Sequence, residues 1–273
     1  MGARLDQIVA ATRRRVAEAR RSADLRVLER QASEHVPREF RSKLSKRAES
    51  GIAIIAELKK ASPSKGLIRA DFQVRSLAKE LEAAGAAALS VLTDEEFFQG
   101  SLGNLRQASE VTQLPCLRKD FIVDEFQLLE ARANRADAVL LIVAALSQAE
   151  LPALAKRARE LGLDVLCEAH DELELQRALD CGCDLIGVNN RDLRTFKVSL
   201  DTAFRLAVRF PTNVVRVAES GLQNGNDIAR LRAAGYHAFL IGESLMKAAS
   251  PGEALRTLMT VAHREQSAVA TRR

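Results

Sequence analysis

Aromatic residues are scarce in this sequence. It has no tryptophan, one tyrosine and ten phenylalanines among 273 residues, so a buried core must consist mainly of aliphatic side chains. The formal net charge is +5, which by itself would suit a polyanionic partner. Proteins that bind nucleic acids usually combine basic residues with aromatic side chains on which bases stack. The shortage of aromatics therefore argues against a nucleic-acid partner.

Long apolar runs are absent as well. The longest, AVLLIVAAL at 138–146, has about half the length that a transmembrane helix requires. The first residues form an arginine-rich segment that lacks the apolar stretch of a secretory signal. We therefore expect a globular protein of the cytoplasm that does not associate with membranes.

Cysteine and histidine are few and widely spaced. The cysteines fit neither a zinc motif nor a redox C-x-x-C motif, and the four histidines are scattered along the chain. These spacings predict no metal site. Few cysteines in a chain of this length are typical of reduced thiols in a cytosolic protein, so we expect four free thiols, at Cys116, Cys167, Cys181 and Cys183.

A strand-like pattern recurs eight times in the middle of the chain. Each run is rich in aliphatic and β-branched residues, ends in a polar residue or glycine, and is followed by a loop and an amphipathic segment. The run ends are spaced about 26 residues apart on average, which is typical of βα units in a parallel sheet. The expected strands are 52–57, 87–93, 115–120, 137–143, 164–169, 185–190, 213–220 and 237–242.

The segments between these strands have helical periodicity. The segments 75–85 and 151–164 each place apolar residues on one face, and each pattern stops at a glycine. The steps LGLDV, CGCDLI and AGYHAF each carry a glycine where a helix would end in a left-handed residue before the next strand. Pro152 and Pro251 suit the first turn of a helix.

Eight such units predict an α/β fold, a single (β/α)8 TIM barrel with an N-terminal helical extension. The alternative is an open doubly wound sheet, which usually has fewer strands. A dinucleotide-binding sheet would show G-x-G-x-x-G after its first strand, where this chain has KKASPSKG. We expect a helical extension at 1–50, the catalytic barrel at 51–262 and a basic tail at 263–273.

Polar residues gather where the expected strands end. In barrel enzymes the active site lies at the carboxyl ends of the strands. Side chains alternate along a strand, so Glu57 and Lys59 share a face while Lys60 points the opposite way. In the same way Lys119 opposes Arg118. The polar strand ends include Glu57, Lys59, Thr93, Lys119, Glu168, Asn189, Glu219 and Ser220. Each residue alone reads most simply as a solvated charge, but the whole set favours a site for acid–base chemistry.

Two loops after the seventh and eighth strands suggest an anion site. The segments AESG at 218–221 and LIGES at 240–244 contain small residues that let backbone N–H groups approach a ligand. Barrels commonly bind phosphate at this place. Two ordinary glycine turns are the simpler alternative. The loop SPSKG at 62–66 is by itself a weak phosphate motif.

Several strings are similar to those of one enzyme family. IAELKKASPSKG, SVLTDEEFFQGS, LRKDFIVDEFQL, ADAVLLIVAAL, IGVNNRDL, VAESG and FLIGESLM occur in this order, and together they resemble the indole-3-glycerol-phosphate synthase family. The resemblance implies ring closure of 1-(2-carboxyphenylamino)-1-deoxyribulose 5-phosphate to indole-3-glycerol phosphate, carbon dioxide and water, in tryptophan biosynthesis. It implies a lyase that needs no metal and no cofactor.

The resemblance also implies roles for individual residues. Lys119 matches the general acid of the RKDF motif and Glu168 matches a catalytic glutamate. Lys59 matches a lysine that neutralises the substrate carboxylate. Glu57 and Asn189 match residues that orient this network, although the division of acid and base roles among the four charged residues stays open.

The family's binding residues can be matched in the same way. Positions that contact the substrate correspond to Ser62, Phe98, Phe121, Arg191, Glu219 and Ser220. Backbone phosphate donors correspond to Gly221, Gly242 and Glu243, and we expect the Glu243 side chain to point away from the phosphate. Glu96 stands where many relatives have lysine, which leaves the role of its loop open.

Other interpretations remain for this sequence. Another phosphate-binding barrel, such as phosphoribosylanthranilate isomerase, would explain the late loops but not the paired lysines. A catalytically silent barrel that acts as a binding protein would be expected to have lost some of the polar strand ends. The expected partner is a phosphorylated small molecule, and the expected assembly is a monomer or a weak homodimer.

Overall fold

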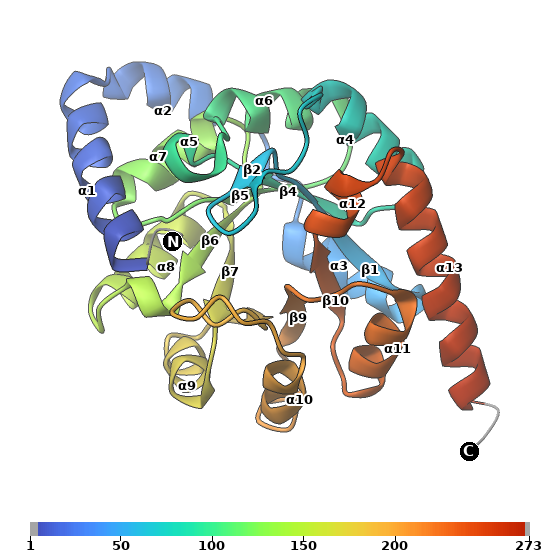
Figure 1. Ribbon diagram of the computed structural model, residues 1–273. Helices are drawn as coiled ribbons and strands as arrows, with labels where there is room; N and C mark the ends of the chain where they lie inside the picture. The colour runs from blue at the N-terminus through green and yellow to red at the C-terminus, as the bar shows by residue number, and fades with distance from the viewer. Residues whose placement is uncertain (1–4, 271–273) are drawn as a thin grey trace.

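Eight parallel strands close into a barrel. The computed structural model describes the backbone of residues 5–270 and the side chains of residues 5–265. The barrel order is β1-β10-β9-β8-β7-β6-β5-β4, with β4 pairing back onto β1 (Figure 1). Its strands are β1 Ala53–Leu58, β4 Ala88–Leu92, β5 Cys116–Lys119, β6 Ala138–Ile142, β7 Asp164–Ala169, β8 Leu185–Asn189, β9 Val215–Glu219 and β10 Ala238–Ile241. The predicted TIM barrel is confirmed, and each predicted strand end lies within two residues of the observed one.

Helices surround the barrel on its outside. In the extension they are α1 Leu5–Ser22, α2 Leu25–Ser33 and α3 Phe40–Ser50. In the barrel they are α4 Val74–Ala83, α5 Glu95–Phe98, α6 Leu102–Val111, α7 Glu125–Ala133, η1 Val143–Ala145, α8 Glu150–Glu160, α9 Glu172–Asp180, α10 Asp201–Ala207, α11 Gly225–Ala233, α12 Glu243–Lys247 and α13 Pro251–Ala270. The segment expected as a plain loop after β1 contains a two-stranded hairpin, β2 Ala61–Ser62 and β3 Gly66–Leu67.

Glycines end several helices as the sequence predicts. Gly85, Gly162, Gly182 and Gly235 all have positive φ, between 68° and 99°. Residues with a Cβ rarely adopt this conformation, so glycine at these steps lets the chain leave a helix and turn into the next strand.

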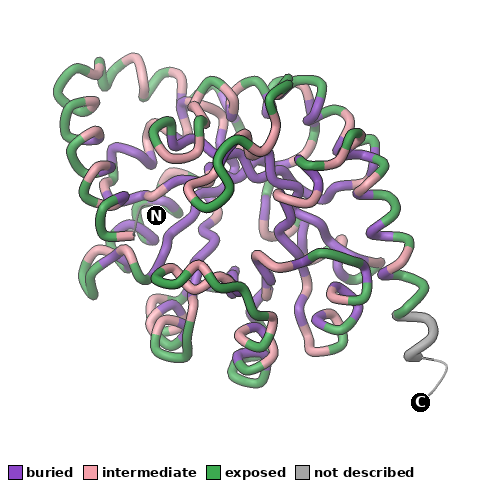
Figure 2. The backbone as a smooth tube through the Cα atoms, in the orientation of Figure 1, coloured by how far each residue is buried: buried purple, intermediate pink, exposed green. Residues whose placement is uncertain are grey.

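Alternation along the strands divides the apolar residues into two cores. One set faces the barrel interior, for example Ile55 on β1 and Leu166 on β7. Their chain neighbours, such as Ile54 and Val165, pack outward against the helices. Figure 2 shows the strands buried along most of their length and the exposed residues on the outer helices and loops. This alternation also decides which polar residues reach the barrel mouth.

The N-terminal extension is fastened to the barrel at both ends. Helix α3 packs against β1, β4, β9 and β10, and its Phe40 and Leu44 belong to the interior core. A buried carboxylate at the start of β6, Asp137, accepts hydrogen bonds from the side chain of His35 at 2.8 Å and from the Arg38 backbone at 2.8 Å. At the other end, Arg15 of α1 donates to Asp94 at 2.9 Å.

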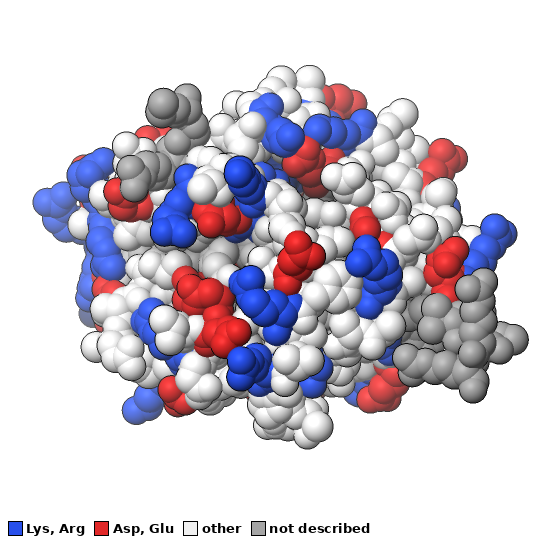
Figure 3. Space-filling model, turned by 60° about the horizontal axis from the view of Figure 1, so that its bottom comes forward, with Lys and Arg blue, Asp and Glu red and all other residues white. Residues whose placement is uncertain are grey.

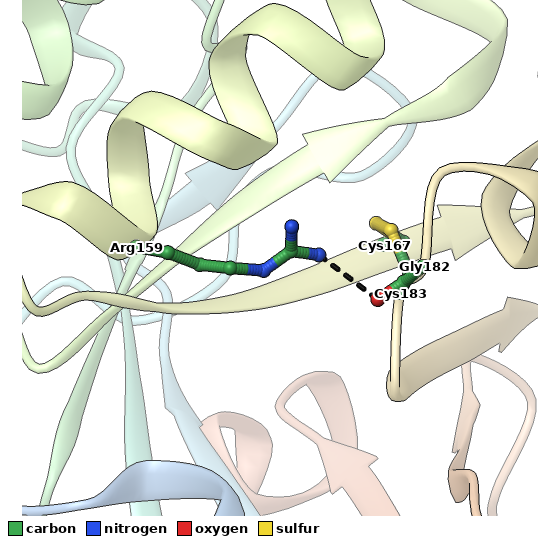
Figure 4. Close-up of a disulfide and its surroundings, with 4 residues drawn as sticks. All are labelled: Arg159, Cys167, Gly182 and Cys183. Carbon is green, nitrogen blue, oxygen red and sulfur yellow. Dashed lines mark hydrogen bonds between the residues drawn. A yellow bond between two sulfur atoms is a disulfide. The ribbon is translucent and has the colours of Figure 1, made fainter.

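The expectation of four free thiols is wrong. Cys167 and Cys183 form a disulfide, while Cys116 and Cys181 are free (Figure 4). Cys167 faces outward on β7, and Cys183 lies in the step that leads into the neighbouring strand β8. Arg159 donates a hydrogen bond to the carbonyl of Gly182 at 3.0 Å beside the bridge (Figure 4). Their separation of 16 residues gave no sign of this contact, because it arises only when β7 and β8 pair.

The surface carries charges of both signs. On the face drawn in Figure 3, Lys and Arg side chains lie among Asp and Glu side chains. Within residues 5–270, no helix has both the length and the apolarity that crossing a membrane requires. Part of the expected basic tail, 263–270, continues helix α13, and residues 271–273 lie outside the described part of the chain.

Candidate active site

A pocket of about 190 Å³ lies at the carboxyl ends of the barrel strands. The predicted site residues come from seven strands and their following loops, yet all fourteen line this one pocket. They are Glu57, Lys59, Ser62, Phe98, Lys119, Phe121, Glu168, Asn189, Arg191, Glu219, Ser220, Gly221, Gly242 and Glu243. Lys60 and Arg118 are not among the pocket residues, which agrees with the predicted alternation.

The floor of the pocket is an ion-pair network around Lys119. The Lys119 Nζ donates to Glu168 Oε2 at 3.2 Å and lies 3.8 Å from Glu219 Oε2. Glu168 Oε1 accepts a hydrogen bond from Asn189 Nδ2 at 3.0 Å. All four side chains come from the last inward position of their strands, so the barrel geometry alone brings β5, β7, β8 and β9 to one point.

Lys59 and Glu57 form a second pair beside this network. The Lys59 Nζ contacts Glu57 Oε2 at 2.5 Å, and both groups are largely shielded from solvent. The Glu57 carboxylate lies so close to Gly242 that a Cβ there would overlap it. A Cβ on Gly187 would likewise overlap the Glu219 carboxylate. A side chain at either position would therefore displace the neighbouring glutamate.

The network moves the pKa values of its members in different directions. Burial acts to lower the pKa of Lys119, but the charges of Glu168, Glu219 and Glu57 outweigh burial and raise it. Burial acts to raise the pKa of Glu168, but Lys119, His170 and Asn189 outweigh it, so that this pKa is lowered. Burial and the negative charge of Glu168 together raise the pKa of Glu219 to about 8. Near neutral pH the floor therefore holds an ammonium, a carboxylate and a carboxylic acid.

One oxygen of Glu219 is left without a hydrogen bond within residues 5–265. Its Oε1 is buried and has no hydrogen-bond partner among the residues that the structure describes. Buried polar atoms are normally paired. This oxygen lies where a Cβ on residue 187 would be, so it packs against Gly187.

One wall of the pocket is apolar. The rings of Phe98 and Phe121 lie with centroids 6.2 Å apart, tilted by 40°. Leu5 and Ile8 of helix α1 line the same pocket, so the extension takes part in the site. We did not predict these two residues. The buried residues Ile8, Thr12 and Val16 are four positions apart on α1. This spacing indicates a helix face that packs against another part of the protein, but it does not identify that part.

Small residues and a buried hydroxyl line another part of the pocket, at the ends of β9 and β10. Gly221 and Gly242 lie there with Ser244, whose buried Oγ has no hydrogen-bond partner within residues 5–265. Ser220 and Gly221 have φ of 64° and 78°, and a left-handed serine is a strained conformation typical of functional turns. Neither Ser244 nor this strain was foreseen from the sequence.

The expectation that the Glu243 side chain points away from the site is wrong in part. Its carboxylate contacts Lys247 at 2.6 Å, but it also lies 3.7 Å from both Lys65 and Arg191. Lys65, Arg191 and Lys247 attract the carboxylate and hold it at the rim.

The residues present favour proton transfer. An ammonium and two differently protonated carboxyl groups lie within reach of one ligand, as general acid–base catalysis requires. Among the described residues, no group of three or more His, Cys, Asp or Glu side chains is arranged to hold a metal ion. A ligand with an apolar ring at one end and an anion at the other would match the two walls.

The sequence is similar to those of one enzyme family. The family model described as indole-3-glycerol phosphate synthase matches residues 5–258. The chain is 59% identical over 259 residues to the indole-3-glycerol phosphate synthase of Koribacter versatilis, covering 95% of this chain and all of that one. It is 48% identical over 252 residues to the enzyme of the same name from Burkholderia ambifaria, covering 92% and 97%.

Solved structures of other proteins share the fold at low sequence identity. The tryptophan synthase alpha chain of Legionella pneumophila aligns with a TM-score of 0.60 and 14% identity, covering 86% of this chain and 99% of that one. Thiamine phosphate pyrophosphorylase from Pyrococcus furiosus aligns with a TM-score of 0.59 and 16% identity, covering 80% and 98%. At this identity the likeness concerns the barrel alone.

Proposed function

Because this chain belongs to the indole-3-glycerol phosphate synthase family, we propose that its pocket carries out the family's ring closure with the residues described above. The chain is a decarboxylating lyase of tryptophan biosynthesis, as its family implies. It converts 1-(2-carboxyphenylamino)-1-deoxyribulose 5-phosphate to indole-3-glycerol phosphate, carbon dioxide and water. The roles of single residues are the proposed part.

Lys119 is the proton donor for ring closure. The ring carbon attacks a ketone, whose oxygen gains negative charge as the new bond forms and needs a proton. The contact of Lys119 Nζ with Glu168, and its proximity to Glu219, is the observation that carries this assignment. The Glu168 carboxylate keeps the lysine charged, and both carboxyl groups hold it in position. Lys119 lies at the floor of the pocket, where the ketone would be shielded from bulk water.

Dehydration after loss of carbon dioxide needs a base and an acid on one intermediate. Glu168 is the carboxylate of the floor and acts as the base, oriented by Asn189. Lys59 neutralises the substrate carboxylate before it leaves as carbon dioxide, and Glu57 positions Lys59. Glu219 carries a proton near neutral pH and, as a residue that lines the pocket, binds a substrate hydroxyl.

The two walls divide the substrate between them. Phe98 and Phe121 contact its aromatic ring, and Leu5 and Ile8 close over the same side. Backbone N–H groups of Gly221, Gly242 and Glu243 bind the phosphate, together with Ser62, Ser220, Arg191 and Ser244. In this arrangement Glu243 gives up its contact with Arg191 when the phosphate arrives, since the dianion is the stronger partner.

The test is to supply the purified protein with the anthranilate-derived ribulose phosphate and to follow the indole fluorescence of the product. We expect turnover without added metal. A Glu168→Gln variant should lose at least about 100-fold in kcat, because the amide cannot accept a proton, while its melting temperature stays near that of the wild type. Folded wild-type protein that leaves the substrate unchanged would contradict the proposed function.

The rival interpretations are weaker after the comparisons. Relatives at 59% and 48% identity share one enzyme name, which favours neither an isomerase of the phosphoribosylanthranilate type nor a silent barrel. A phosphorylated small molecule fits the family as partner. The cytoplasmic location, the monomeric or weakly dimeric state, and the division into extension, barrel and tail remain predictions.

A further inference from the structure

One titratable side chain touches the catalytic network without lining the pocket. His170 follows β7 at the inward position next after Glu168, because alternate residues of a strand share a face. Its side chain is 12% exposed, against 2% for Glu168. No role has been given to it so far.

The His170 ring lies between two carboxylates. Its Nδ1 is 2.9 Å from Glu174 Oε2, and the His170 backbone N–H donates to the same oxygen at 2.8 Å. Its Nε2 is 3.3 Å from Glu168 Oε1, within ion-pair distance, but it makes no well-aligned hydrogen bond with any described residue. A neutral imidazole has one N–H, whereas a ring that faces a carboxylate at each nitrogen is best satisfied as the imidazolium.

The charges around the ring support the same state. The titratable groups that act on His170 are Glu168, from its own strand, and Glu174, from α9. Burial lowers the pKa of His170, but these two carboxylates outweigh burial and raise the pKa to about 10. Arg177, also on α9, is directed to the backbone carbonyls of Val143 and Leu146 and not to the ring.

We propose that His170 is a positioning residue for the reaction, whose imidazolium, held by Glu174, keeps Glu168 ionised and oriented toward Lys119. The proposal rests on the catalytic role given to Glu168 under the proposed function. Glu168 then has a cation on each side, Lys119 at Oε2 and His170 at Oε1, with Asn189 completing Oε1. A buried carboxylate with two cationic neighbours stays ionised until the step in which it accepts a proton.

Glu174→Gln tests this without touching the pocket. Removing the outer carboxylate makes the imidazolium easier to deprotonate, so we expect the alkaline limb of the kcat profile to move down by about one pH unit or more. For a limb that moves down by about one unit from about 10, the loss relative to wild type is about twofold at pH 9 and about fivefold at pH 10. KM should change much less, because no substrate contact is altered. His170→Asn removes the cation outright and should lower kcat over the whole pH range.

Glu172→Gln is the matched control. Glu172 lies on the same helix turn, bears the same charge and pairs with the exposed Arg209 at 3.3 Å. Its pH profile should superimpose on that of the wild type. Lys119 and Glu219 are present in every variant, so their own titration is common to all curves.

Three outcomes would overturn the proposal. A Glu174→Gln profile that matches Glu172→Gln would show that the ring charge is irrelevant. A kcat reduced equally at every pH in Glu174→Gln, with a lower melting temperature, would indicate a structural role only. Full activity in His170→Asn would show that Glu168 needs no second cation. Failure of the proposed function is distinguishable, since then the wild type itself would not convert the substrate.

Discussion

Replacing Lys119 with methionine separates chemistry from folding at the centre of the site. Methionine has a similar length but no proton to donate. Loss of a general acid costs about 100- to 10,000-fold in rate, which corresponds to about 3 to 5 kcal/mol of activation free energy. We expect Lys119→Met to lower kcat by about 100-fold or more, while binding of the product, indole-3-glycerol phosphate, stays measurable.

The effect on folding should be smaller. Removing one member of a buried ion pair costs about 3 to 5 kcal/mol when the other charge is left alone. Here Glu168 keeps Asn189 and His170, and Glu219 already carries its proton near neutral pH. The free energy of unfolding should therefore fall by less than about 3 kcal/mol, which leaves a folded protein for the assay.

Two further variants show which property of Lys119 matters. Lys119→Arg keeps the positive charge but holds its protons too tightly to donate them, so its kcat should be nearly as low as that of Lys119→Met. Lys60→Met removes a lysine that follows β1 and lies outside the pocket, and it should leave kcat unchanged. Single-turnover fluorescence gives the rate of the chemical step. A kcat for Lys119→Met within tenfold of wild type would refute the assignment of Lys119 as the proton donor.

Three other predictions concern groups around the site and the barrel. The pKa of Glu219 is about 8 in the folded protein, against an ordinary value of about 4.3. Its contribution to stability is therefore fully present below about pH 4.3 and is lost as pH rises through about 8. Thermal melts should therefore show Glu219→Gln gaining on wild type between about pH 5 and pH 9, and a constant difference would contradict the shift. The lowered pKa of Asp137 predicts the reverse sign: Asp137→Asn should cost about 3 to 5 kcal/mol at pH 7 in chemical unfolding, and the difference should shrink as pH falls below about 4. A thiol titration of unfolded, unreduced protein should find two reactive cysteines, and a count of four would exclude the Cys167–Cys183 bridge.

Much of the barrel could be predicted because its signals are local. The alternation of β1 placed Ile55 and Glu57 on one face and Ile54 and Leu58 on the other, and this depends only on the geometry of an extended chain. The glycine steps at Gly162 and Gly235 likewise depend on what one residue can adopt. Where local signals suffice, the expected and observed elements agree.

The misses are contacts between segments that are distant in sequence. Nothing near Cys167 indicates Cys183, and nothing in α1 indicates that Leu5 and Ile8 reach the pocket. The contact between Glu243 and Arg191 depends on how the segments after β8 and β10 meet at the rim of the pocket. Each of these needs the closed barrel before the two partners are within reach of each other.

The sequence by itself determined the order of strands and helices, the inward face of each strand and, through family resemblance, the chemistry. Only the tertiary structure decided the protonation of the site, because the charge on Glu219 or His170 depends on burial and on neighbours that other strands supply. Periodicity is a property of a few adjacent bonds, whereas an electric field at one atom is a sum over everything that folding brings near it.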